Sequence, residues 1–127
     1  MMKHSSVGHK TWALPGCCIP AESTGEEPAH TSRDEISILN TGESVAAIEI
    51  MIYYTDREPV GPYRITVDAK RMRTIRFNDL IDPEAILLAK EFAALLQSDR
   101  PVVVQFSRLD TAHGGRDHST TIAFPVT

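Results

Sequence analysis

A charged connection between two predicted strands holds the residues best suited to chemistry. Asp56, Arg57, Glu58 and Arg64 lie close together in the chain, around a rigid turn at residues 59–62. Their carboxylates and guanidinium groups could bind a polyol through several hydrogen bonds, or a ligand carboxylate through a bidentate fork. A stiff turn lowers the entropic cost of holding such groups in place. The same charges could instead form internal salt bridges that fix the loop.

Polar residues also mark the ends of later predicted strands. If these strand ends meet at one edge, they form a single pocket with Asp56 and Glu58, because loops on a rigid scaffold commonly carry ligand sites. They could equally contact a neighbouring subunit. These residues are Arg76, Asn78, Asp79, Gln105, Arg108 and Asp110.

Trp12 is the only tryptophan of the chain. A flat aromatic face beside polar groups suits the stacking of a sugar ring. Because aromatic side chains contribute large buried areas, Trp12 could instead belong to the core or to a subunit interface.

A basic stretch begins within the charged connection and has few acids. Arg57, Lys70, Arg71 and Arg73 could contact nucleic-acid phosphates or an acidic partner. No recognition helix or stacking motif accompanies them, and a solvated basic face is the alternative interpretation.

The overall composition describes one domain. The chain has 127 residues, of which 42% are hydrophobic, and a net charge of −4. This suits a single packed core and argues against binding nucleic acid through global charge. No apolar run is long enough for a signal peptide or a membrane helix, so we expect a soluble, cytoplasmic protein.

The cysteine pattern favours neither a disulfide framework nor a metal site. Cys17 and Cys18 are the only cysteines, and a disulfide between neighbours is strained, which fits a reducing compartment. In a strand they would point to opposite faces, one buried and one exposed. No Cys-x-x-Cys pair indicates a metal, and no Gly-x-Ser-x-Gly elbow indicates nucleophilic catalysis. We therefore expect no metal, no cofactor and no enzymatic activity.

Period-two alternation of apolar residues predicts strands through most of the chain. We expect a flexible arm at residues 1–10 and a single domain at 11–127. The predicted strands are 11–19 (bent at Pro15-Gly16), 34–39, 45–54, 63–67, 72–77, 92–97, 102–109 and 120–124. The alternation places in the core Ile48, Ile50, Ile52, Tyr63, Ile65, Ile75 and Phe77.

Two connections carry signals of their own. Asp82, Pro83 and Glu84 have the residue types of a helix start, so we expect a short helix at 83–90. The turn-forming residues 97–101 favour a hairpin between the strands on either side. The expected fold is all-β: an antiparallel β-sandwich of about seven or eight short strands with one short helix.

Several runs of sequence resemble a known family. They are YYTDREPVGPYR at residues 53–64, RFNDL at 76–80, PVVVQ at 101–105 and SRLD at 107–110. Together with residues 38–42 and Trp12-Ala13, they resemble the sensory rhodopsin transducer family from about Thr11 to Thr127. The departures lie mainly in residues 1–10, 29–34 and 110–119.

The resemblance implies a small β-sandwich that assembles as a cyclic homotetramer. The family is named after a soluble cytoplasmic partner of a microbial sensory rhodopsin, and it has been viewed more broadly as a domain that binds small molecules such as sugars. On this interpretation the chain is a non-enzymatic signalling module that binds a small polar ligand. The ligand-binding residues we predict are Trp12, Asp56, Glu58, Arg64, Arg76, Asn78, Gln105 and Arg108.

Two alternatives remain open. The chain could be an adaptor that docks on the cytoplasmic face of a membrane photoreceptor, where basic residues are in excess and an acidic net charge would help. It could also be a regulator that contacts DNA through Arg57, Lys70, Arg71 and Arg73.

Overall fold

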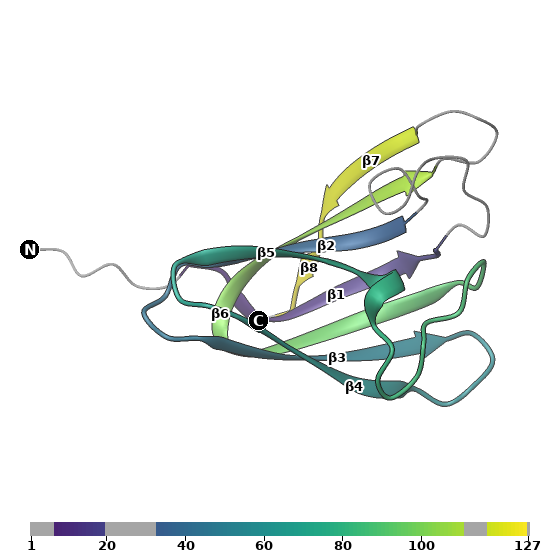
Figure 1. Cartoon of the computed structure of the whole chain (residues 1–127), viewed down its shortest axis with the longest axis horizontal. Coiled ribbons are helices and arrows are strands. Elements are labelled where there is room, and N and C mark those ends of the chain that lie inside the picture. Colours follow the sequence, from purple (N-terminus) through teal and green to yellow (C-terminus); the bar gives the residue numbers. More distant parts are fainter. Residues whose placement is uncertain (1–6, 20–32, 111–116, 127) are drawn as a thin grey trace, which may run out of the picture.

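The computed structural model describes residues 7–19, 33–110 and 117–126 (Figure 1). Within these ranges it contains eight strands and one short 3₁₀ helix, η1 (Phe77–Asp79). The strand pairs are antiparallel, which confirms the predicted fold class. The strands are β1 (His9–Cys17), β2 (Arg33–Asn40), β3 (Ala46–Tyr54), β4 (Val60–Val67), β5 (Arg71–Arg76), β6 (Phe92–Asp110), β7 (Asp117–Ile122) and β8 (Phe124–Pro125).

The strands form two layers that share β6. The first layer has the order β4-β3-β6-β1-β8, and the second has the order β5-β2-β6-β7. The first half of β6 pairs with β1 and β3, and its second half pairs with β2 and β7. In Figure 1 this light-green strand runs along the lower layer, turns at one end of the molecule and returns along the upper layer.

The hairpin predicted at residues 97–101 is wrong, because β6 continues through this segment as a single strand of 19 residues. Neither layer provides a ladder partner for residues 99–101, so Pro101 costs no sheet hydrogen bond there. The Asp99 carboxylate accepts the Ala47 backbone N–H at 2.8 Å, and the Ser98 hydroxyl accepts the Arg100 N–H at 3.2 Å. The turn-forming residues therefore bend the strand between layers and do not reverse it.

The short helix predicted at residues 83–90 is also wrong, because the chain there is irregular. Its backbone groups bond to the sandwich and not to one another. The Tyr63 hydroxyl donates to the Glu84 carbonyl at 2.6 Å, and the Leu87 N–H donates to the Tyr54 hydroxyl at 3.3 Å. These tertiary hydrogen bonds use groups that a helix would need, so the local start signal does not prevail.

The connection after β3 is shorter than predicted. Residues 55–59 form the loop, and β4 already begins at Val60, so Gly61 and Pro62 lie within a strand. Gly61 has φ +144°, and a Cβ there would stand 2.8 Å from the Ile50 carbonyl oxygen. Only glycine allows β4 to pass β3 this closely.

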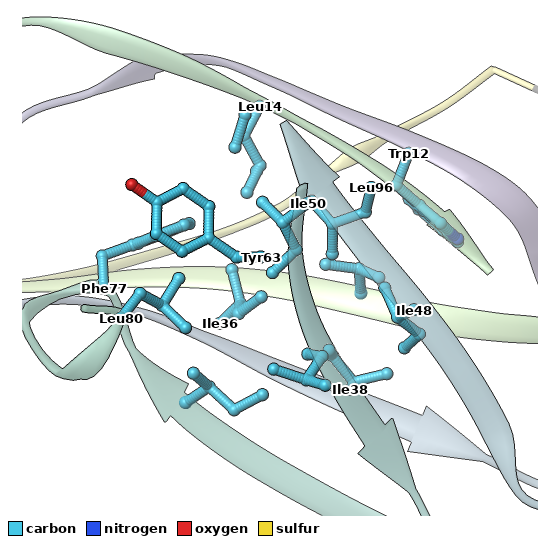
Figure 2. Close-up of a cluster of buried hydrophobic side chains, with 14 of the residues drawn as sticks. Trp12, Leu14, Ile36, Ile38, Ile48, Ile50, Tyr63, Phe77, Leu80 and Leu96 are labelled. Atoms are coloured by element: carbon cyan, nitrogen blue, oxygen red, sulfur yellow. The ribbon is translucent and has the colours of Figure 1, made fainter. Parts of the chain in front are cut away.

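The core lies between the two layers, and the predicted alternation is confirmed. All seven residues expected in the core are buried, with at most 8% of each exposed. They interleave with side chains from β1, β2 and β6, as Figure 2 shows for Ile48, Ile50 and Tyr63 beside Leu14, Ile36 and Leu96. Alternating strands from two layers thus supply one continuous apolar interior.

Asn40 ties the ends of three strands together inside this core. It is fully buried, and its Nδ2 donates to the carbonyls of Ser44 at 2.9 Å and Val67 at 3.0 Å. Its Oδ1 accepts the Gly42 N–H at 3.0 Å. The side chain satisfies backbone groups at the ends of these strands, so the turn after β2 depends on it.

Replacing Asn40 by alanine should lower the free energy of unfolding by about 3 kcal/mol, since it leaves several buried backbone groups without partners. Urea denaturation measures this loss. Ser44→Ala is the matched control, because Ser44 contributes only its carbonyl, and it should change stability by less than about 0.5 kcal/mol. Equal stability of the two variants would contradict this role of Asn40.

Candidate ligand-binding site

An open cavity of about 540 Å³ lies at the end of the sandwich where β1 and β3 finish and β6 begins. A register shift between Leu14 and Cys17 bends β1 at Pro15-Gly16, as predicted, and widens the wall there. Arg108 reaches the cavity from near the far end of β6. The polar or aromatic groups that line it include those of Cys18, Tyr53, Thr55, Glu91, Phe92 and Arg108.

Arg108 is held in place by a buried carboxylate. Its Nε and Nη2 donate to Asp34 Oδ1 and Oδ2 at 2.7 and 2.9 Å, and Asp34 is 0% exposed. The Cys18 backbone N–H donates to Asp34 Oδ2 at 2.8 Å. The hydrogen bond to Asp34 holds the pKa of Arg108 above its ordinary value. The guanidinium is thus a fixed cation, and its pairing partner lies behind it, away from the cavity.

The sequence analysis missed Asp34, although a signal was present. Asp34 lies on the same face of β2 as Ile36 and Ile38, which are buried. A carboxylate on the core face of a strand needs a cationic or hydrogen-bonding partner. In the sheet register Asp34 stands directly opposite Arg108, which is that partner.

The two cysteines both line the cavity as neutral thiols. Cys17 is buried and Cys18 partly exposed, close to the expected division. Burial raises the pKa of Cys17 to about 12, and it also raises the pKa of Cys18. Both shifts favour the neutral thiol over the nucleophilic thiolate at neutral pH.

The charged connection forms internal salt bridges, which was one of the two roles predicted for its charged side chains. Asp56 accepts from Lys90 Nζ at 2.7 Å and from Arg57 Nε at 3.1 Å. Arg57 also lies over the Tyr54 ring, 5.2 Å from its centroid. The hydrogen bond from Lys90, followed by that from Arg57, lowers the pKa of Asp56 to about 2. Lys90 fixes the loop to the irregular segment before β6.

The other predicted arginines are also paired with carboxylates of the chain. Arg64 contacts Glu49 at 3.4 Å on the outer face of the first layer, away from the cavity. Arg76 forms a fork with Asp79 at 3.0 and 2.9 Å. With the Arg57–Asp56 and Arg108–Asp34 pairs, four of the predicted arginines thus have an acidic partner within the chain. A ligand carboxylate would meet guanidinium groups whose charge these acids already balance.

Trp12 is a core residue. It is 3% exposed, and its Nε1 donates to the carbonyls of His9 and Val102 at 2.9 and 3.0 Å. Figure 2 places its indole beside Leu96 and Ile48. No face of the ring is open to a sugar, so the structure favours the core alternative.

The predicted site residues do not all converge. Only Arg108 lines the cavity. Gln105 lies on the outer face of the second layer, beside Leu39 and Val103. Glu58 is exposed in the loop after β3, and Asn78 is half-buried in η1. The cavity is instead completed by Tyr53, Thr55 and Glu91, which were not predicted.

The predicted basic patch is divided. Arg57 precedes β4 and Lys70 follows it, so about 25 Å of strand separates them. Lys70 pairs with Glu43 at 3.2 Å, and Arg73 donates to the Thr66 carbonyl at 2.8 Å. Arg71 donates to the Lys70 carbonyl at 2.9 Å. No continuous strip of cations for a nucleic acid forms among these four residues.

The chain is thus a small antiparallel β-sandwich with a polar cavity at one end. Comparison with protein families matches residues 7–125 to the family model of the Anabaena sensory rhodopsin transducer. The chain therefore belongs to the Anabaena sensory rhodopsin transducer family, as the sequence resemblance suggested.

Solved structures agree with this assignment. The Anabaena sensory rhodopsin transducer is 47% identical, with a TM-score of 0.74 over 81% of this chain and 99% of its own. The Thermotoga maritima protein 1070 is 28% identical, with a TM-score of 0.81 over 93% of this chain and 95% of its own. A comparison with curated proteins found no match. Among the described residues, no helix has the length and apolar character to cross a membrane.

The Lys90–Asp56 contact predicts how Asp56 titrates. A carboxylate whose pKa is lowered in the folded state contributes stability above its unfolded pKa, and that contribution is lost as the pH falls toward about 2. Lys90→Met should raise the pKa of Asp56 toward its ordinary value of 3.8, as measured by NMR titration of the carboxyl carbon. Lys70→Met, at the other end of β4, is the control and should leave Asp56 unchanged. An equal effect of both variants would refute the contact.

Proposed function

We propose that this protein is a non-enzymatic signalling module of the cytoplasm that binds a small polar ligand, such as a sugar, in the cavity beside Arg108. The observation that carries the proposal is the meeting of hydrogen-bonding groups from both layers at one cavity. Arg108 offers donors, Glu91 offers acceptors, and the Thr55 hydroxyl can act as either. Tyr53, which is 41% exposed, adds an aromatic wall.

The size and rigidity of the cavity support ligand binding. A volume of about 540 Å³ is within the range of small-molecule sites, roughly 300–1,000 Å³. The described residues of its walls lie at or next to strand ends, so binding requires little ordering of this part of the protein. The raised pKa values of Cys17 and Cys18 support a role in binding over nucleophilic catalysis.

We also propose a photoreceptor partner and a homotetramer. The 47% identical relative is by name a transducer of a sensory rhodopsin, which supports a related partner here.

Leu39, Met72 and Val103 stand in one row on the outer face of the second layer, and Leu39 and Met72 are 41% and 59% exposed. An apolar row with no charge is typical of the centre of a subunit interface and supports the assembly.

Ligand binding can be tested with a thermal-shift screen of neutral sugars and polyols, followed by calorimetry of any compound that binds. Tyr53→Ala should weaken that binding about tenfold, since it removes an exposed cavity wall without disturbing the core. Arg64→Ala is the control, because Arg64 is exposed and lies outside the cavity. Absence of any ligand, or equal losses in both variants, would contradict the cavity as the site.

Light scattering tests the assembly and the partner together. The protein alone should have four times the 14.1 kDa mass of one chain. Addition of a detergent-solubilised sensory rhodopsin encoded beside this gene should give a heavier complex. A monomer would refute the tetramer, and a missing rhodopsin gene or complex would refute the photoreceptor partner.

A further inference from the structure

We propose that Asp34, assisted by Glu91, sets the charge of the ligand that the cavity accepts, so that uncharged hydroxyl-bearing compounds bind and anions are rejected. This inference depends on the proposed ligand site and adds the residues that determine its specificity. Asp34 does not touch the cavity. It acts as a positioning and neutralising residue behind Arg108.

The ion pair occupies one of the two edges of the guanidinium that can bind an anion. A carboxylate or phosphate is bound best by two parallel N–H donors of a guanidinium. In Arg108 the pair formed by Nε and Nη2 already faces Asp34 at 2.7 and 2.9 Å. Among the described residues, the two N–H groups of Nη1 and the second N–H of Nη2 donate no further hydrogen bond, so they are the donors left for a ligand in the cavity. A hydroxyl oxygen can accept from these donors, whereas an anion would meet a guanidinium whose charge Asp34 already balances.

The electrostatics of the cavity also disfavour an anion. Asp34 is 0% exposed, so water screens its charge little, and it cancels most of the positive field of Arg108. Glu91 is an exposed carboxylate in the wall, while the neighbouring Lys90 is bound to Asp56. Among the described residues that line it, the cavity therefore has no uncompensated cation and one carboxylate. An anion would meet repulsion there, whereas a hydroxyl can accept from Arg108 and donate to Glu91.

Asp34 is also fixed independently of any ligand. Its Oδ2 accepts the Cys18 backbone N–H at 2.8 Å, which ties the end of β1 to the start of β2. Three hydrogen bonds to one buried carboxylate leave it little freedom to turn toward the cavity. The neutralisation of Arg108 is thus a permanent property of the folded chain.

The test compares glucose with glucuronate, which differ chiefly by a carboxylate, in calorimetric titrations at constant ionic strength. The wild-type protein should prefer glucose. Asp34→Asn leaves Arg108 with an uncompensated charge, and the glucuronate-to-glucose affinity ratio should rise by at least about tenfold. Glu35→Gln is the matched control, since Glu35 lies next in the strand, on the outer face, bound to Arg33 and Ser107. It should leave the ratio unchanged.

The outcomes separate this inference from the proposed function. If the wild-type protein binds neither compound but Asp34→Asn gains glucuronate binding, the proposed neutral ligand is wrong and the role of Asp34 stands. Wild-type preference for glucuronate, or a folded Asp34→Asn protein with an unchanged response to glucuronate, overturns the inference. If Asp34→Asn does not fold, Glu91→Gln replaces it, because Glu91 is exposed. That variant should raise the ratio about threefold, and no rise overturns the inference.

Discussion

The continuous strand β6 is the constraint on which the rest of the structure depends. A straight strand of 19 residues would place its ends about 60 Å apart. Because β6 leaves one layer and enters the other, it doubles back, and Phe92 and Arg108 line the same cavity. The bend also lets β6 bond to four partner strands, two in each layer. The cavity at the end of the sandwich is therefore a direct result of how one strand crosses between layers.

The Asp34–Arg108 pair at this end of the molecule has a desolvation cost that only good geometry can offset. Removing a carboxylate from water is unfavourable, and a buried ion pair is often no more stabilising than apolar residues of the same volume. Here two charge-assisted bonds and a backbone N–H satisfy the carboxylate. Such a pair contributes most through the position that it imposes on the half-exposed guanidinium.

Much of the fold could be predicted from the sequence, because alternation along strands is a local property. The buried positions of Ile48, Ile50 and Ile52 follow from period two alone. The two errors have a common cause. The helix-start signal at Asp82 and the turn signal at residues 97–101 are local, and each was overridden by contacts to distant strands. Turn-forming residues can bend a strand as well as reverse it, and only the pairing of neighbouring strands distinguishes the two.

The candidate site was less predictable, because the use of a charged side chain depends on its partner. Arg57 and Arg76 pair with acids one and three positions away in sequence, which residue spacing can suggest. Arg64 pairs with Glu49, and Arg108 pairs with Asp34. In each pair the two residues stand directly opposite each other on neighbouring strands. That opposition is fixed by sheet register, and register cannot be read from composition or local charge. An arginine indicates a ligand only when some of its N–H donors are free, and here the register of β2 against β6 determines which donors of Arg108 face the cavity.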